Sequence, residues 1–266
     1  MTYNFISGLP RSGSTLLASI LNQNPDFHAD IISPLGPVVS AIRTAFSPGN
    51  ETHMVWTNDQ RHAVIEAVFD AFYEKYLDKV IFDTHRRWCA DASLIAKVFP
   101  DSKIICCVRE PTHVVDSFER LFRKNPLVAS VMIQSDVQAT VYERVGILLQ
   151  STGVVGYALN ALRDAFYGPE CKRLLLIEYN LLARHPGPVL ERLHEFLDLA
   201  PFEYDFNNIK EVPGTAEFDR LLGAPGLHDL QPKVTLEPRT AVLPPDLIMR
   251  MPKAFWRVNE SVTQIP

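Results

Sequence analysis

The stretch Gly8-Leu9-Pro10-Arg11-Ser12-Gly13-Ser14-Thr15 decides how the rest of the sequence is interpreted. It follows the apolar run YNFIS at residues 3–7 and precedes a stretch with helical spacing at residues 14–21. Glycines at both ends of a strand-to-helix turn let backbone N–H groups converge, and with the helix N-terminus they bind an anion. The spacing GxxxxG followed by two residues is that of a phosphate-binding P-loop. An ordinary Gly/Ser/Pro turn is the alternative.

The lysine that usually follows the second glycine of a P-loop is absent, because position 14 is serine. Arg11 is the cation that the loop contains instead. Enzymes that hydrolyse ATP use that lysine on the β- and γ-phosphates. The loop therefore favours a ligand with a shorter phosphate chain than a nucleoside triphosphate.

Strands and helices alternate along the chain. Besides residues 3–7, three apolar runs have the length of buried strands: 79–83 (KVIFD), 103–108 (KIICCV) and 173–178 (RLLLIE). Helical spacing is found at residues 14–21, 59–77, 90–99, 112–123, 137–149, 155–166 and 188–197. This alternation predicts an α/β fold with three layers, a P-loop fold whose central parallel sheet is flanked by helices. We expect one domain over residues 1–266, with the less regular segment 200–266 covering the nucleotide and acceptor site.

Composition narrows the class of protein. The chain has 266 residues, 47% of them apolar, and a formal net charge of -5, whereas a general nucleic-acid binder is usually basic. An anion site must therefore use local positive charge.

The four cysteines have no zinc-site spacing, and the neighbours Cys106 and Cys107 should point to opposite faces of a strand. With no signal-like N-terminus or membrane-spanning run, we expect a cytoplasmic protein that binds neither nucleic acid nor membrane. The sequence gives no sign of an oligomeric state.

Polar residues follow each predicted strand, at the edge of the sheet where ligands of open α/β folds bind. After the P-loop these are the segment 83–87 (DTHRR), Arg109 and Tyr179. Arg109 ends a buried strand, where a cation is costly without an anionic partner. Ser117 would stand on the following helix, and an arginine with a hydroxyl can hold a second phosphate. The alternative for Arg109 is a surface pair with a neighbouring carboxylate, Glu110 or Asp116.

Two of these segments resemble a known family. Residues 8–17 (GLPRSGSTLL) and 106–121 (CCVREPTHVVDSFERL) are similar to the two nucleotide-binding motifs of P-loop sulfotransferases, and the resemblance extends to residues 79–88 and 175–197. It implies a sulfotransferase that moves a sulfuryl group from 3′-phosphoadenosine 5′-phosphosulfate to a hydroxyl or amine of an acceptor. Adenosine 3′,5′-bisphosphate would be the product, no metal would be needed, and the acceptor would be a small molecule or a macromolecule.

The resemblance also assigns residues. Arg11 matches the basic residue that neutralises the bridging 5′-phosphosulfate, and Arg109 with Ser117 matches the pair that binds the 3′-phosphate. Tyr179 resembles a tyrosine that touches the nucleotide, with a half-buried core tyrosine as the alternative. The arginine-lysine-glycine run of the C-terminal nucleotide loop is missing, and Lys233 in LQPKV is the substitute for its charge. The turn that cradles the anion is formed by Ser12, Gly13, Ser14 and Thr15.

The acceptor proton needs a base, and the leaving oxygen needs positive charge. His85 resembles the histidine of a Lys-Thr-His stretch that is the base in cytosolic sulfotransferases, but Asp83 stands where that lysine would be. Asp83 could orient His85 or be the base itself, and His85 could instead be a surface or capping histidine. The next candidates are Asp30 and His28, which lie near the position of a glutamate base in protein-tyrosine sulfotransferases.

Two other classes of protein stay open. A P-loop nucleotide kinase or triphosphatase would use Asp83, at the end of an apolar strand, to bind magnesium. A nucleotide-binding module without catalytic activity is the weaker alternative. If the chain is a sulfotransferase, residues 31–58 and 128–166 are expected to shape the acceptor pocket.

Overall fold

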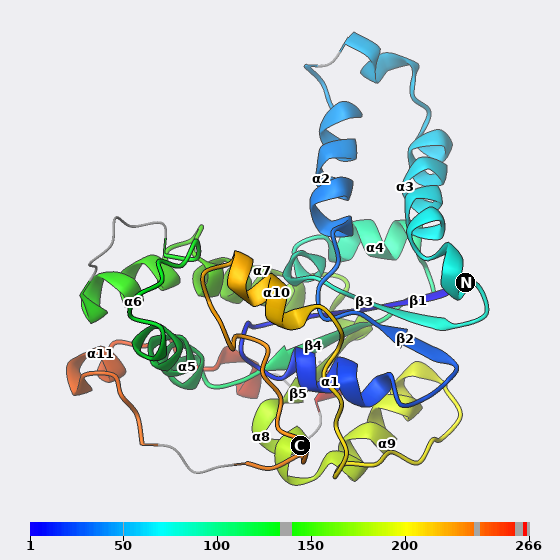
Figure 1. Ribbon diagram of the computed structural model, residues 1–266. Helices are drawn as coiled ribbons and strands as arrows, with labels where there is room; N and C mark the ends of the chain where they lie inside the picture. Colours follow the sequence, from blue (N-terminus) through cyan, green and yellow to red (C-terminus); the bar gives the residue numbers. More distant parts are fainter. Residues whose placement is uncertain (50, 134–139, 237–239, 259–262, 265–266) are drawn as a thin grey trace.

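The computed structural model describes residues 1–49, 51–133, 140–236, 240–258 and 263–264. Its centre is a sheet with the strand order β2-β3-β1-β4-β5-β6, in which every neighbouring pair is parallel (Figure 1). The predicted parallel sheet is thereby confirmed, and β2 and β6 extend it at its two edges. The strands are β1 (Thr2–Gly8), β2 (Phe27–Ala29), β3 (Val80–Thr84), β4 (Ile104–Val108), β5 (Leu174–Glu178) and β6 (Thr263–Gln264).

All seven predicted helices occur, and α2 and α8 were not predicted. The short helices α10 and α11 lie in the less regular segment 200–266. The predicted helix 59–77 ends at Phe72, and its last residues form the 3-10 helix η2 (Glu74–Tyr76). Of the predicted helix 137–149, residues 137–139 lie outside the described part. The helices are α1 (Ser14–Leu21), α2 (Leu35–Ala45), α3 (Asn58–Phe72), α4 (Ala92–Val98), α5 (Pro111–Lys124), α6 (Val141–Leu149), α7 (Val154–Tyr167), α8 (Tyr179–Arg184), α9 (Pro186–Leu197), α10 (Thr215–Leu221) and α11 (Pro245–Met249), with further 3-10 turns η1 (Glu51–Val55), η3 (Arg86–Cys89), η4 (Cys171–Arg173) and η5 (Phe255–Val258).

Alternate strand residues bury against two different layers of helices. Ile104 and Cys106 belong to a core built with side chains of α3, α4, α5, α6 and α7. Ile105 and Cys107 belong to a second core, built with α1, α8 and α9. This period of two is what a strand buried on both faces produces. The sheet therefore has helices on both faces, and the two adjacent cysteines do point apart as predicted.

The turn after β1 requires both of its glycines. Gly8 has a φ of 98°, and a Cβ there would lie 2.3 Å from the carbonyl oxygen of Cys107 on β4. Gly13 has a φ of 93°, and its Cβ would lie 2.9 Å from the ring of Tyr179. Arg11, between them, is held at a φ of 58°, a left-handed conformation that costs a non-glycine residue free energy. Contacts from β4 and α8 therefore fix the shape of this loop.

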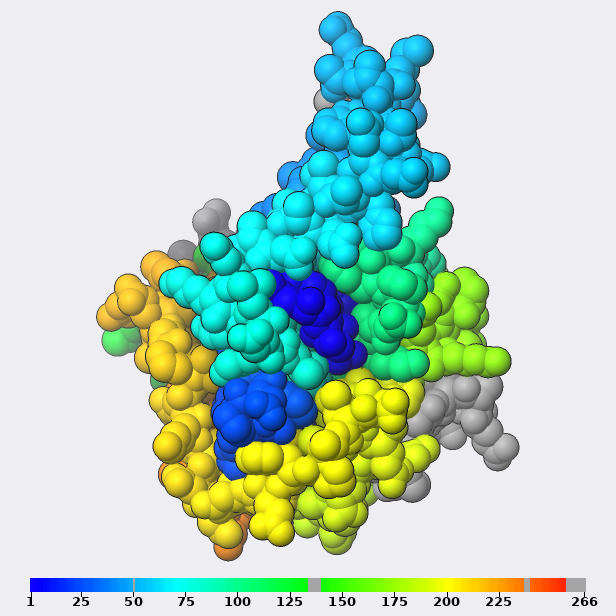
Figure 2. All heavy atoms as spheres, turned by 90° about the vertical axis from the view of Figure 1, so that its right-hand side faces the viewer, coloured from blue at the N-terminus to red at the C-terminus, as the bar shows by residue number. Residues whose placement is uncertain are grey.

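Helices α2 and α3 form a hairpin that stands out from the body of the molecule (Figures 1 and 2). At its far end the rings of Phe46 and Trp56 pack with centroids 4.9 Å apart. The side chain of Thr57 caps α3 through the backbone N–H of Gln60. The near end of α2 is buried at Leu35 and Gly36, so this end is the one anchored to the sheet.

The segment Val141–Tyr167 is apolar and long enough to cross a membrane by length and composition, with a mean hydropathy of 1.4. In the fold it forms two separate helices, α6 and α7, joined by residues 150–153. Leu159, Leu162 and Phe166 of α7 are buried in the core on the sheet. Packing against the sheet thus accounts for the apolar character of α7.

Candidate active site

The residues that follow β1, β3, β4 and β5 line one cleft of about 500 Å³ at the carboxyl ends of the strands. Figure 1 shows this edge of the sheet lying between α1, α5 and α10. Among the described lining residues the only carboxylate is Asp229. The lining cations are Arg11, Arg86, Arg109, Arg120, Lys124 and Lys233. A chain with a net charge of -5 therefore concentrates positive charge at this cleft, as an anion site requires.

The two motifs of the sequence meet through Arg11. Its Nε donates to Oγ of Ser117 on α5 at 3.0 Å, and its carbonyl oxygen accepts from Nη1 of Arg109 at 3.3 Å. The guanidinium of Arg109 lies over the ring of Tyr179, with Cζ 4.2 Å from the centroid, which is a cation–π contact. Tyr179 also packs against Gly13. These side chains are brought to one place, as the sequence predicted, and Tyr179 orients Arg109 and supports the loop.

The four residues after Arg11 differ in what they present. Gly13, Ser14 and Thr15 line the cleft at the start of α1, where backbone N–H groups are free of partners within the helix. Ser12 is buried, and its hydroxyl donates to the carbonyl oxygen of Pro10 at 3.3 Å. The side chain of Ser12 therefore holds the loop together, and its backbone is the part left for a ligand.

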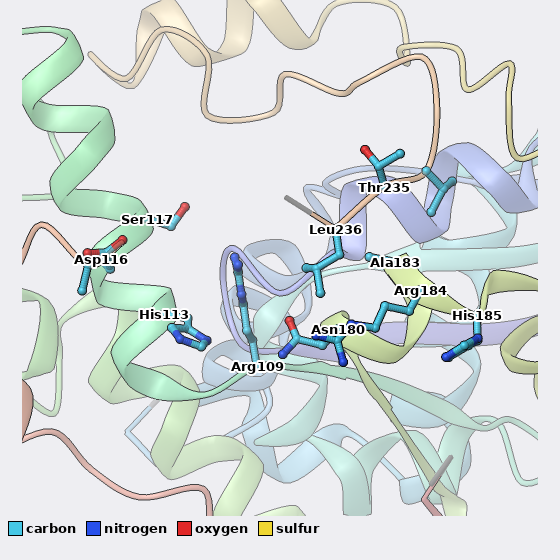
Figure 3. Close-up of a pocket in the computed structure, with 12 residues that line it drawn as sticks. Arg109, His113, Asp116, Ser117, Asn180, Ala183, Arg184, His185, Thr235 and Leu236 are labelled. Atoms are coloured by element: carbon cyan, nitrogen blue, oxygen red, sulfur yellow. The ribbon is translucent and has the colours of Figure 1, made fainter. Parts of the chain in front are cut away.

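A second cavity of about 700 Å³ continues from Arg109 and Ser117 (Figure 3). In Figure 3 both side chains face the same space, next to His113 and Asn180. Asp116, an alternative partner for Arg109, is instead bonded to Nε of Arg120 at 2.8 Å. The geometry suits a second phosphate, which the Arg109 guanidinium and the Ser117 hydroxyl would meet together.

His85 lines the cleft, but its hydrogen bonding differs from that of a base. Its Nδ1 accepts a hydrogen bond from the backbone N–H of Arg87 at 3.1 Å, so that His85 caps η3. A neutral imidazole whose Nδ1 accepts must carry its proton on Nε2. Burial, with the charges of Arg86 and Arg87, lowers the pKa of His85 to about 4. The residue thus presents an N–H donor to the cleft, and the capping alternative of the sequence describes it better.

Asp83 does not reach the cleft, which corrects the sequence expectation. Its side chain has 0% exposure, Oδ1 accepts from Nε1 of Trp88 at 2.6 Å, and Oδ2 lies 2.7 Å from the hydroxyl of Tyr73. It makes no hydrogen bond to His85 among the described residues. A carboxylate enclosed in this way can neither take a proton from an acceptor nor bind magnesium beside a nucleotide. Its role is to join β3 to α3 and η3.

The two other candidate bases, Asp30 and His28, also lie outside the cleft. His28 Nε2 and Asp30 Oδ1 are 3.1 Å apart, and the His28 ring stacks on Tyr76 with centroids 3.6 Å apart. Neither residue lines the cavities described here. They belong to the packing between β2 and α3.

Sequence reasoning did not single out two residues that line the cleft, Arg86 and His228. Arg86 lines it with a guanidinium that has no acidic partner among the described residues, although its place directly after a strand end and His85 was a signal. His228 also lines it, bonded to Asp219. Nothing in the sequence marked this pair, since Asp219 and His228 stand nine positions apart and form no recognisable motif.

A groove of about 500 Å³ reaches His85 from the other side. It runs along one face of α2 and is closed by Arg87 and by Tyr157 of α7. The side chains of α2 that line the groove are small; they belong to Pro37, Ser40, Ala41 and Thr44. The groove thus comes from the two parts of the chain that were expected to shape the acceptor pocket.

Comparison with known proteins gives a consistent family. The chain is 23% identical over 210 residues to protein-tyrosine sulfotransferase 2 of Gallus gallus, a match of 74% of this chain and 51% of the relative, so the chain spans about half the length of that relative. Its fold is similar to that of the sulfotransferase domain from the curacin biosynthetic pathway, with a TM-score of 0.51, 20% identity and coverage of 76% of this chain and 75% of that one. The sulfotransferase domain of the Synechococcus PCC 7002 olefin synthase matches with a TM-score of 0.48 and 19% identity over 94% and 92% of the two chains. Residues 5–204 match the model of the sulfotransferase family, and this chain belongs to that family.

Proposed function

We propose that this protein transfers a sulfuryl group from 3′-phosphoadenosine 5′-phosphosulfate to a hydroxyl or amine of an acceptor. The observation that carries the proposal is the joining of Arg11, Arg109 and Ser117 at the carboxyl edge of the sheet. It supports a donor with two anionic ends, one at the P-loop and one at the cavity beyond Arg109. Membership of the sulfotransferase family supports the same reaction.

Each group of the cleft has a task in this reaction. The N–H groups at the start of α1 and the Arg11 guanidinium meet the 5′-phosphosulfate, where negative charge grows on the bridging oxygen as the sulfuryl group leaves. Arg86 adds a second positive charge from the other wall of the same cleft. Arg109 and Ser117 hold the 3′-phosphate through charge-assisted and neutral hydrogen bonds. Lys233, exposed at the cleft, supplies charge from the C-terminal segment.

The kinase alternative loses the residue on which it rested, because Asp83 lies in the core. For the acceptor, we propose the groove between α2 and α7, since it ends at His85 on the border of the cleft. Its open, small-residue lining admits an extended group whose hydroxyl or amine enters first. We also propose that the reaction needs no metal ion and that the protein binds neither nucleic acid nor membrane. The proposed location is the cytoplasm.

A ligand-binding experiment tests the donor. Thermal unfolding of the full chain is followed with adenosine 3′,5′-bisphosphate, with ATP and magnesium, and with neither. The bisphosphate at about 100 times its Kd should stabilise the protein by about 2.7 kcal/mol, because it binds only the folded state. Stabilisation by ATP with magnesium alone would contradict the proposal.

Transfer is tested by incubating the protein with the phosphosulfate donor and a panel of alcohols, phenols and amines, with sulfonated products detected by mass spectrometry. Activity should persist in a chelator, because arginines meet the anion. Loss of activity in the chelator that magnesium restores would contradict the metal-free mechanism.

A further inference from the structure

Asp219 and His228 form a buried pair in the C-terminal segment. Asp219 on α10 is 1% exposed, and its Oδ2 accepts from the backbone N–H of His228 at 2.8 Å while its Oδ1 accepts from the ring Nδ1. Both oxygens of the Asp219 carboxylate therefore accept hydrogen bonds from the same residue, His228. The turn between them is fixed as well, since the N–H of Ala224 donates to the carbonyl oxygen of Asp219 at 2.9 Å and that of Leu227 to Ala224 at 3.0 Å.

This contact determines the tautomer of His228. An ionised carboxylate only accepts hydrogen bonds, so Nδ1 must carry the ring proton and Nε2 keeps its lone pair. No described residue hydrogen-bonds this Nε2. His85 is the opposite case, because a backbone N–H occupies its Nδ1 and its proton is on Nε2. Of the two histidines that line the cleft, His228 is the one whose free ring nitrogen can take a proton.

The surroundings of His228 suit a base. It lines the same cleft as Arg11, Arg86 and His85, and His85 also borders the acceptor groove. Burial lowers the pKa of His228, and so do the charges of Arg11 in the P-loop and Arg86 on η3, whereas Asp219 on α10 raises it. Its ring is therefore neutral at neutral pH, and the carboxylate behind it stabilises the imidazolium that forms during the reaction, as in hydrolase triads.

We propose that His228, positioned by Asp219, is the base that takes the acceptor proton, an inference that rests on the proposed function. Nε2 takes the proton of the acceptor hydroxyl or amine as that oxygen or nitrogen bonds to the sulfur. The bond between sulfur and the 5′-phosphate oxygen breaks, and its electron pair stays on that oxygen, which Arg11 faces. The sulfonated acceptor and adenosine 3′,5′-bisphosphate leave, and the imidazolium loses its proton to water.

The tautomers are tested without an acceptor. Nitrogen-15 NMR of the histidine-labelled full chain distinguishes Nδ1–H from Nε2–H in each ring. We expect Nδ1–H for His228 and Nε2–H for His85. Finding Nε2–H at His228 overturns the proposal, whatever reaction the protein catalyses.

The role in catalysis is tested with His228→Asn, which keeps an amide N–H near the position of Nδ1 for Asp219 and removes Nε2. With the donor and an acceptor that the panel identifies, kcat should fall about 10²–10⁴-fold while the Kd of adenosine 3′,5′-bisphosphate changes little. The control is His62→Asn, an α3 residue that lines none of the described cavities, with unchanged kcat. Full kcat in His228→Asn overturns the base and leaves the proposed function standing, whereas a wild-type chain that binds no bisphosphate overturns both.

Two further variants separate catalysis from folding. In His228→Ala, added imidazole should restore part of kcat, which a purely structural histidine would not allow. Asp219→Asn removes the counter-charge of the imidazolium, so the acid limb of the kcat profile should move to lower pH. An unmoved acid limb together with no rescue by imidazole overturns the proposal.

Discussion

At the residue scale, the cleft shows how one neighbouring atom decides what a histidine can do. The Nδ1 of His85 meets a backbone N–H, and the Nδ1 of His228 meets a carboxylate. The two rings therefore carry their protons on opposite nitrogens. Arg109 shows the same dependence on neighbours, because the Tyr179 ring and the carbonyl oxygen of Arg11 aim its guanidinium at the second cavity.

Arg109→Ala should weaken adenosine 3′,5′-bisphosphate by about 10- to 100-fold, because a hydrogen bond to a charged group contributes about 1.5–3 kcal/mol. Adenosine 5′-phosphosulfate, which has no 3′-phosphate, should lose far less affinity. Isothermal titration with both nucleotides measures the difference. Arg192→Ala, an exposed arginine of α9, is the matched control. Equal losses for the two nucleotides would show that Arg109 does not bind the 3′-phosphate.

At the scale of elements, the short helix η3 connects the core to the cleft. Trp88 within it donates to the buried Asp83, while His85 at its start and Arg86 line the cleft. Helix α2 packs against the His85 ring, because at Gly36 there is no room for a side chain beside that ring. The position of His85 is thus set jointly by η3 and α2.

Gly36→Ala should displace the His85 ring, since the new Cβ would lie 2.5 Å from Nδ1. We expect the free energy of unfolding to fall by about 1–3 kcal/mol, which is typical of overpacking, and transfer activity to fall with it. Urea unfolding and the sulfonation assay measure the two effects. Gly146→Ala on α6 is the control, because nothing lies within 4 Å of its Cβ and alanine should stabilise the helix by about 0.5–1 kcal/mol. A Gly36→Ala protein as stable and active as the parent would mean that α2 does not hold the ring.

At the scale of the whole molecule, one buried network ties strands β2 and β3 to the end of α3. The hydroxyl of Tyr73 lies 2.8 Å from Asp30 Oδ2 and 2.7 Å from Asp83 Oδ2. A phenol has one hydrogen, so one of these contacts needs a protonated carboxyl that donates to the phenol oxygen. Burial raises the pKa of Asp83 to about 6, so its carboxyl holds a proton below about pH 6 and loses it above that pH. Folding stability should therefore depend on this proton.

The pKa of Asp83 is about 6 in the fold against an ordinary 3.8, a difference that corresponds to about 3 kcal/mol. Because the folded pKa is the higher one, the stabilisation is complete below about pH 4 and is lost as the pH rises through about 6. Urea unfolding across this range should show Asp83→Asn gaining stability relative to the wild type as the pH rises. The exposed Asp59→Asn is the control. Parallel pH profiles for the wild type and Asp83→Asn would show that Asp83 ionises freely in the fold.

The sequence by itself determined the sheet and the edge of the sheet at which the proposed anion site lies. Apolar runs of strand length separated by helical spacing give a parallel sheet, and the carboxyl ends of its strands must then share one edge. That is why the P-loop, Arg109, Ser117 and Tyr179 were found together as predicted. These are local signals, carried by residues within one strand, turn or helix.

Only the tertiary structure decided which titratable groups face the cleft. Asp83 and His85 are two residues apart, yet one is enclosed by Tyr73 and Trp88 and the other lines the cleft. The link between Asp219 and His228, and the place of His228 in the same cleft as Arg11, depend on how the C-terminal segment folds over the sheet. Burial and hydrogen-bond partners set the charge and tautomer of a side chain, and those partners come from segments far apart in the sequence.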